Sequence, residues 1–369
     1  MEENSMIQKA GNNSVQYQVE KYYDGISGKE LENVITDIRN FISEENKLLL
    51  ENMRIVATET AQERLDNYTE ILIPRLVKAE ILTAFSEPAM QFLFKESEKT
   101  AISTDRETDY EMLSELLVHR IYNKEDYTIS AAISKAINEV NNISEEALLT
   151  LTLVYAIQTY IPLSGNIREG LATLDTLYGQ ILKYYQLPED TDWVDNLEVV
   201  NALKVTTIGG SKKLDDYFYE KIIGYSLLGI KKDNNDLKNF TKRLKEAGLP
   251  TSILVENEFD KEYVRLEIAS ESSIDDMYLN DSVNDVKKDL TDSQKQIIFD
   301  IYKSYSNAAK VNQEKFNNAL REFKNINTII EWWNNNITNL SFKITAIGKV
   351  IACANAIRID STLPNPIHK

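Results

Sequence analysis

Apolar side chains recur at spacings of three and four along most of the chain, which is the period of an amphipathic helix. One such pattern runs from Ser43 to about Phe85 and would form a helix of about 60 Å. Its inner face includes Leu65 and Leu72, and Pro74 is expected to kink the helix without ending it. Because a helix of this length needs a long partner, we expect it to pack either against a second copy of itself or within the core of its own chain.

Further helices with short connections are predicted before and after the long helix. Ser27 with Glu30 forms a capping box that opens a helix before the long one, and Ser144 with two acidic residues behind it is typical of a helix start. Each later helix carries an apolar stripe. The predicted ranges are Glu87–Ile102, Tyr110–Asn123, Ile129–Asn141, Ser144–Tyr160, Ile167–Tyr185, Trp193–Val205, Leu214–Ile230 and Asp236–Ala247, with long helices again from Ser293.

The N-terminal leader, residues 1–27, has a different pattern. Residues 11–14 read as a turn, and Val15, Tyr17 and Val19 alternate with polar residues like a short strand. Such a strand is not stable alone. We therefore expect either a loose leader or a strand that pairs with a neighbouring copy or another protein, which makes these three residues interface candidates.

Strand patterns return after Ile230. Residues 264–268 alternate between apolar and polar positions, and they are expected to pair with residues 253–255 through a turn. Residues 270–292 are polar and acidic and are predicted to form a loop. A short β-hairpin is therefore expected in this part of the chain.

The chain closes on a strand and a helix. Phe342 and Ile344 predict the strand, and Thr345 is the expected cap of a helix at Ala346–Ala356. The whole pattern predicts a mostly α fold: a multi-helix bundle with one long N-terminal helix and a small α+β C-terminal region, made of a short β-hairpin and a strand-turn-helix. The expected divisions are residues 1–27 (leader with a short strand), 28–85 (long helical segment), 86–230 (helical bundle domain) and 231–369 (α+β C-terminal region).

Composition narrows the class of protein. Glycine and proline, at 12 and 7 in 369 residues, are scarce, as expected for long helices. The net charge of −17 argues against non-specific nucleic-acid binding by the acidic body, whereas residues 291–369, with 10 basic and 6 acidic side chains, leave such a contact open. We find no signal-peptide pattern and no run apolar enough for a membrane span. With one cysteine, the chain is expected to be cytoplasmic and not to contact a membrane.

The scarcity of histidine and cysteine restricts the chemistry. Two histidines and one cysteine exclude a histidine-rich zinc site, an intrachain disulfide and a CxxC pair, and no nucleotide-binding motif is present, so no cofactor is predicted. Glu111, Glu115 and His119 share one face of a predicted helix and could bind a metal ion. The alternative interpretation is a structural histidine with acidic neighbours.

Three other features have a structural and a functional interpretation. Acidic clusters could hold Mg²⁺, but most of them lie at helix starts, where negative charge favours the helix dipole. Gly209–Lys213 superficially resembles a phosphate-binding loop but lacks its spacing, and a turn is predicted. Of the adjacent tryptophans, Trp333 is expected in the core and Trp332 is an interface candidate.

Four segments carry a family resemblance: Gly11–Ser14 with Gln16 and Gln18, Glu59–Arg64, Glu87–Gln91, and Ile344–Ala352. In this order they resemble an uncharacterised bacterial family of mostly helical cytoplasmic proteins, and the resemblance would cover nearly the whole chain. The leader is also similar to those of bacterial proteins from anti-phage loci. The closing strand-turn-helix is similar to a piece of winged-helix domains, although it lacks a basic recognition helix.

These observations favour a non-enzymatic, self-associating helical protein that acts through contacts with other copies or other proteins, in bacterial defence or stress response. Two alternatives stay open. One is a carboxylate–metal hydrolase or nuclease that uses Glu111, Glu115 and His119. The other is a nucleic-acid binder that uses the basic C-terminal quarter.

Overall fold

The computed structural model describes Thr36 and residues 54–77, 87–183, 186–206, 209–281, 286–307 and 310–367. The chain divides into two compact units, residues 1–63 and 64–369. In the first unit the described residues 54–63 are helical, with Ile55 and Val56 exposed. The predicted leader strand with Val15, Tyr17 and Val19 and the predicted start of the long helix at Ser43 lie outside the described residues.

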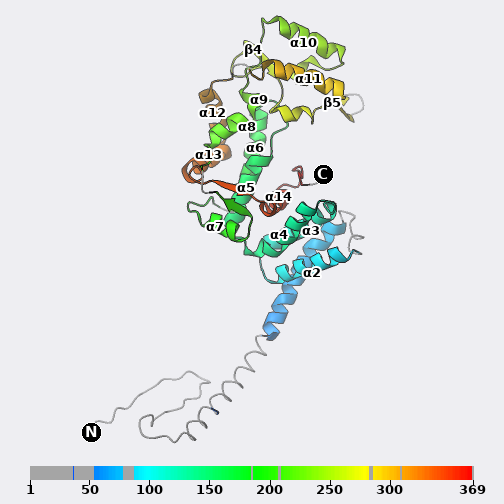
Figure 1. The fold of residues 1–369 in the computed structure, drawn as a ribbon, viewed down its shortest axis with the longest axis vertical. Helices are drawn as coiled ribbons and strands as arrows, with labels where there is room; N and C mark the ends of the chain where they lie inside the picture. Colours follow the sequence, from blue (N-terminus) through cyan, green and yellow to red (C-terminus); the bar gives the residue numbers. More distant parts are fainter. Residues whose placement is uncertain are drawn as a thin grey trace, which may run out of the picture. The chain divides into compact units, whose positions relative to one another are not determined.

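The second unit is mostly helical, with small antiparallel sheets, and this confirms the predicted fold class (Figure 1). Residues 64–77 are helical, and the further helices are α2 (Pro88–Ile102), α3 (Glu107–Tyr122), α4 (Tyr127–Glu139), α5 (Glu145–Thr159), α6 (Ile167–Leu182), α7 (Asp192–Val199), α8 (Leu214–Lys221), α9 (Ile223–Ser226), α10 (Asn235–Glu246), α11 (Asp292–Tyr305), α12 (Gln313–Arg321), α13 (Lys324–Asn336) and α14 (Ala346–Ile359). The strands are β1 (Leu203–Val205), β2 (Ile230–Lys231), β3 (Leu254–Glu256), β4 (Tyr263–Leu266), β5 (Tyr278–Asp281), β6 (Val286–Asp289) and β7 (Phe342–Ile344).

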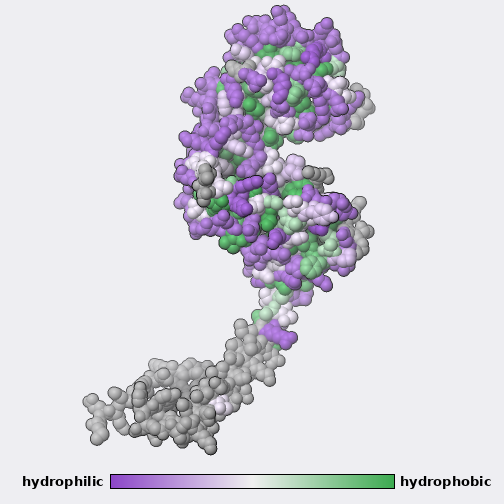
Figure 2. All heavy atoms as spheres, in the orientation of Figure 1, coloured by the Kyte–Doolittle hydropathy of each residue, from purple (hydrophilic) through white to green (hydrophobic). Residues whose placement is uncertain are grey.

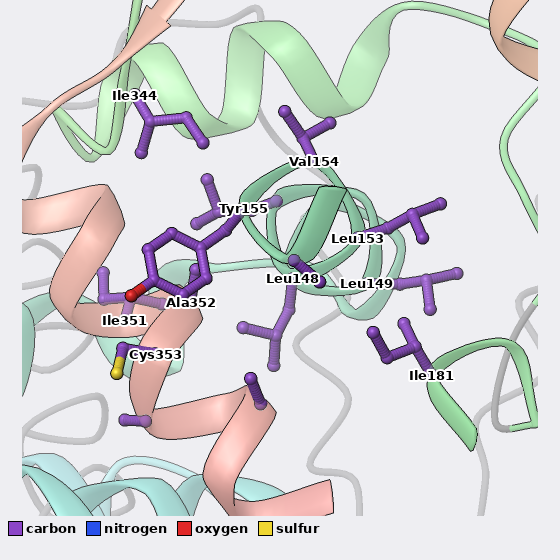
Figure 3. Close-up of a cluster of buried hydrophobic side chains, with 14 of the residues drawn as sticks. Leu148, Leu149, Leu153, Val154, Tyr155, Ile181, Ile344, Ile351, Ala352 and Cys353 are labelled. Carbon is purple, nitrogen blue, oxygen red and sulfur yellow. The ribbon is translucent and has the colours of Figure 1, made fainter. Parts of the chain in front are cut away.

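The closing helix α14 lies at the centre of the larger core. It packs against α3, α4 and α5, and its residues from Val350 to Ala354 are fully buried. A helix that is apolar on all sides is stable only when protein surrounds it. Figure 3 shows Ile351, Ala352 and Cys353 of α14 beside Leu148 and Tyr155 of α5. The predicted cap is confirmed, because the Thr345 side chain accepts a hydrogen bond from the Gly348 amide.

The start of α14 is fixed by an earlier part of the chain. The predicted strand at Phe342–Ile344 is confirmed, and it pairs with β1 in an antiparallel register that places Lys343 opposite Lys204. The expectation of a helix from Trp193 to Val205 is wrong at its end, because α7 stops at Val199 and β1 follows. The reason is Asn201, whose φ of 56° turns the backbone out of the helix.

A second, smaller core contains residues between Leu227 and Tyr305. In it α10 and α11 pack beside a three-stranded sheet of order β2-β4-β3, and the expected hairpin is confirmed, with Leu254 paired to Leu266. The predicted helix at Leu214–Ile230 is instead broken into α8, α9 and β2, since the backbone leaves helical geometry at Ile222 and Gly229. From Phe316 onward the buried apolar residues belong to the larger core again.

The segment 270–292, expected to be a loop, contains the hairpin of β5 and β6. Apolar–polar alternation is absent because these strands lie at the surface: Tyr278 is 43% exposed, and Lys287 and Lys288 are exposed. The Lys287 ammonium lies 4.4 Å from the centroid of the Tyr278 ring, so a cation–π contact links the two strands on their exposed face. A surface hairpin of this kind has no hydrophobic signature in the sequence.

Arg265 joins the two cores. It is 1% exposed, and its Nη2 donates to the Gly165 carbonyl at 2.9 Å while Nη1 donates to the Leu266 carbonyl at 3.0 Å. Its guanidinium carbon lies 5.8 Å from the centroid of the Tyr225 ring, and burial lowers the pKa of Arg265. The backbones are in close contact here, because a Cβ added at Gly165 would lie 1.9 Å from the Glu267 carbonyl. A glycine is therefore required at position 165.

We expect Gly165→Ala to destabilise the protein by about 2–4 kcal/mol, because the new methyl group collides with backbone that cannot rotate away. Gly248→Ala is the matched control. A Cβ at Gly248 meets nothing within 4 Å, so only the φ of 69° opposes it, at about 1 kcal/mol. Urea denaturation of both variants measures the difference. Equal losses of stability would show that the two backbones are not locked together at Gly165.

Candidate functional site

The structure places Glu111, Glu115 and His119 on one face of α3. Two arginines from other helices, Arg75 and Arg358, contact this face. Glu115 Oε1 is 3.3 Å from His119 Nε2 and its Oε2 is 3.3 Å from Arg75 Nη1. Glu111 lies 3.7 Å from Arg75 Nη2 and 2.9 Å from Arg358 Nη1. The side chain of His119 is fully buried. The carboxylates therefore face fixed positive charges, which repel a divalent cation.

This network is continuous with the core. Arg358 Nε donates to Asn355 Oδ1 at 2.8 Å, and Asn355 Nδ2 donates to Thr152 Oγ1 at 2.8 Å. In the part of the chain that the structure describes, no group of three or more histidine, cysteine or acidic residues is arranged to hold a metal ion. A buried charge costs several kcal/mol unless it is paired, and the glutamates supply this pairing. The contacts favour a structural role for Glu111, Glu115 and His119.

Asn365 brings the single cysteine close to the buried histidine. Its Nδ2 lies 2.9 Å from His119 Nε2, and its Oδ1 accepts a hydrogen bond from Cys353 Sγ at 3.5 Å. Cysteine, histidine and asparagine are the residue types of a thiol hydrolase. Here the asparagine lies between the other two, so neither hydrogen bond joins the imidazole to the thiol. Cys353 is 0% exposed, and burial raises the pKa of its thiol to about 11. The thiol is therefore protonated at neutral pH and is not a nucleophile.

A cavity of about 570 Å³ opens beside this network and contains three lysines. They come from three elements: Lys204 from β1, Lys343 from β7, and Lys349 from the first turns of α14. The further lining residues are Asp126, Ile129, Tyr155, Thr159, Ile344, Thr345, Ala346, Pro366 and Ile367.

The position of the lysines follows from the fold. Antiparallel pairing places Lys204 and Lys343 side by side. Thr345 donates its backbone N–H to the Ala202 carbonyl at 3.1 Å, which fixes the start of α14, and therefore Lys349, against the turn before β1. Among the described residues, none of the three lysine side chains forms an ion pair. The cavity lining therefore carries more positive than negative charge, although the whole protein is acidic.

Sequence reasoning did not find this cavity. The mildly basic C-terminal quarter contains Lys343 and Lys349, but Lys204 lies far earlier in the chain. Only the register of β1 with β7 brings it to the same place. A three-residue strand such as β1 has too short a pattern to predict its partner.

Of the predicted interface residues, Leu65, Leu72 and Trp332 are among the described residues, and they pack in the core of the chain. Leu72 is 2% exposed and Trp332 is 7% exposed, and the indole Nε1 of Trp332 donates to the Pro188 carbonyl at 2.7 Å. Leu65 is partly buried and packs against the larger core. Trp333 is buried, as expected. Core packing within one chain already accounts for the apolar character of these residues.

The two other sequence features also have structural contacts. Gly209, the first residue of the predicted turn, has a φ of 98°, and Lys212 forms an ion pair with Glu220 at 2.7 Å. Asp215 lies in the first turn of α8, and its carboxylate is 3.5 Å from Arg321 Nη2. These contacts support the turn and the helix-start interpretations.

We expect Cys353 to be unreactive in the native protein. Raising a thiol pKa from 9.0 to about 11 lowers the thiolate fraction at pH 8 by about a hundredfold, and burial blocks access as well. Reaction with 5,5′-dithiobis(2-nitrobenzoate) should be at least about a hundredfold slower in buffer than in 6 M guanidinium, where about one equivalent reacts. Because the chain has one cysteine, no other thiol contributes. Rapid stoichiometric labelling of the folded protein would contradict the buried, protonated thiol.

Comparison with known proteins gives one result. A protein-family model whose description reads only “-like”, and which names no activity, matches residues 34–363. No curated protein and no solved structure shows a significant match. The matched range includes the smaller core, all of the larger core except Ile367, and most of the residues around the lysine cavity. The chain belongs to the protein family whose model spans residues 34–363.

Proposed function

We propose that this protein is a non-enzymatic, self-associating protein that acts through contacts with other copies and other proteins. The observation that carries the proposal is the exposed apolar surface on the long helical segment. In the second unit Ile73 and Val77 are 52% and 54% exposed, one turn apart, while Tyr68, Leu72 and Leu76 are almost fully buried. The helix over residues 64–77 therefore has an apolar face beyond the one that its own core covers.

The first unit supports the same interpretation. Its described helical residues include Ile55 and Val56, which are 53% and 62% exposed. Single exposed apolar residues are common on protein surfaces, but exposed β-branched residues one turn apart, such as Ile73 and Val77, are typical of helix–helix interfaces. A second copy of the same segment offers a surface of matching chemistry and length. Self-association through this segment would bury these side chains in both copies.

The candidate catalytic side chains on α3 and α14 are either paired with other side chains or buried. Glu111 and Glu115 pair with arginines, His119 is buried beside Glu115, and Cys353 is protonated and buried. These contacts support a binding role over a hydrolytic one. None of the helices among the described residues is long and apolar enough to cross a membrane.

We place this role in the bacterial cytoplasm and connect it with defence against phage or with stress. This part of the proposal depends on the resemblance of the N-terminal leader to leaders of proteins from anti-phage loci. Cells that carry the gene should form fewer plaques than cells with an empty vector when challenged with a phage panel. Equal plaque numbers for every phage, together with unchanged survival under heat and oxidative stress, would contradict it.

The wild-type protein is expected to form dimers or larger oligomers at micromolar concentration in light scattering after size exclusion. Replacing Ile73 and Val77 together by Gln should weaken this association at least about tenfold, because the variant loses exposed apolar area but keeps good helix formers. The melting temperature of the folded chain should change little, since both side chains lie outside the core.

Val199→Gln is the matched control. Val199 is 80% exposed on α7, away from the long helical segment in the sequence, and its replacement should leave the oligomer intact. A wild-type protein that is monomeric at about 10 µM, a concentration at which an interface with micromolar affinity is occupied, would refute self-association. Equal association of the double variant and wild type would refute this face as the interface.

A further inference from the structure

We propose that the lysine cavity binds a small phosphate monoester, a dianion with an organic body of the size of a nucleotide or a sugar phosphate. This binding site is independent of the self-association proposed above. The inference starts from the charges. Lys204, Lys343 and Lys349 face one cavity, and Asp126 is the acidic residue among the lining side chains. The side chains of the cavity therefore carry two net positive charges.

The aspartate has another role. Asp126 Oδ1 accepts hydrogen bonds from the amides of Thr128 and Ile129, both at 3.0 Å, as the N-cap of α4. Its negative charge is therefore held by the start of that helix. None of the lysines forms an ion pair with it or with any other described residue. A phosphate dianion would compensate the two remaining positive charges.

The start of α14 adds donors. Thr345 accepts a hydrogen bond from the Gly348 amide, and the amides of the first turn, at Ala346 and Ile347, have no acceptor within the helix itself. The positive end of the helix dipole lies at the same place. Ala346 lines the cavity, so a phosphate among the three lysines would also lie close to this helix end.

The remaining wall fits an organic body. Tyr155, Ile344 and Ile367 contribute buried aromatic and aliphatic surface, and Figure 3 shows Tyr155 and Ile344 on neighbouring elements. Residues 365–367 close this side, because Asn365 Oδ1 accepts a hydrogen bond from the Ile367 amide at 3.1 Å and Asn365 Nδ2 lies 2.9 Å from His119 Nε2. A volume of about 570 Å³ lies within the usual range for small-molecule sites.

A small ligand fits better than a nucleic acid. A nucleic-acid site needs positive charge along several consecutive phosphates, and the net charge of the chain is −17. The lysines converge on one cavity, and acidic residues are plentiful elsewhere on the surface. Figure 2 shows hydrophilic residues over most of the visible face, but hydropathy does not separate the two signs of charge.

The experiment is isothermal titration calorimetry of the full chain with AMP, glucose 6-phosphate, inorganic phosphate and a 12-nucleotide single strand. At least one phosphate monoester should bind with a stoichiometry of one per chain, and adenosine or glucose should not. Lys343→Gln and Lys349→Gln should each weaken this binding about ten- to a hundredfold, the usual effect of removing one charged donor from a phosphate contact.

Lys238→Gln is the matched control. Lys238 is exposed on α10 and lies outside the lining of the cavity, and its replacement changes the net charge by the same amount. Equal weakening by Lys238→Gln would attribute binding to net charge and overturn the proposal. Absence of saturable binding of every phosphate monoester up to about 10 mM, where even millimolar affinity is visible, would overturn it too. Binding of the oligonucleotide alone, with the same lysine dependence, would assign the cavity to a nucleic acid and refute the small-ligand proposal.

Discussion

Burial of α14 is the packing interaction on which the rest of the second unit depends. This helix is the last in the chain, yet it fills the space among α3, α4 and α5, which precede it by many residues. Its central residues are small or aliphatic and fully buried, so neighbouring helices approach it closely on all sides. The larger core is therefore incomplete until the C-terminal residues have folded back. Contacts of such long sequence separation are slow to form, because the loop must close before they stabilise the chain.

The polar network follows from the same burial. An inserted helix brings its polar side chains with it, and α14 carries Asn355 and Arg358. Thr152 satisfies the first and Glu111 the second, while Arg75 binds both Glu111 and Glu115. Removing Glu111 would leave Arg358, whose side chain is 12% exposed, without its carboxylate partner, which is the costly case for buried ion pairs. Glu111 and Glu115, which resemble metal ligands in the sequence, thus neutralise arginines, one of which is Arg358 near the end of α14.

The sequence predicted the helices and strands better than it predicted which of them lie next to each other in the fold. Several features were predicted because they depend on residues close in the chain. These are the helix periods, the Thr345 cap, and a hairpin between residues 253–255 and 264–268, for which the structure pairs Leu254 with Leu266. The failures have a physical cause as well. The left-handed Asn201 ends α7 without a glycine or proline to mark it, and the β5–β6 hairpin is exposed on the surface and shows no alternation. The lysine cavity needs a strand pairing across much of the chain, which no local pattern contains.

Stability and ligand binding are coupled at the start of α14. The Thr345 amide donates to the Ala202 carbonyl, and a Cβ at Gly348 would lie 2.0 Å from that same oxygen. Asn365, which follows α14, forms a hydrogen bond with His119 of α3. These contacts assemble the walls of the cavity, so the cavity exists only when α14 is docked. A ligand that binds this state and not the unfolded chain adds its binding free energy to the docking of α14. Without a ligand the lining holds three lysines and one acidic residue, Asp126, so its side-chain charge is net positive. An anion in the cavity would therefore balance this charge in the same step that completes the core.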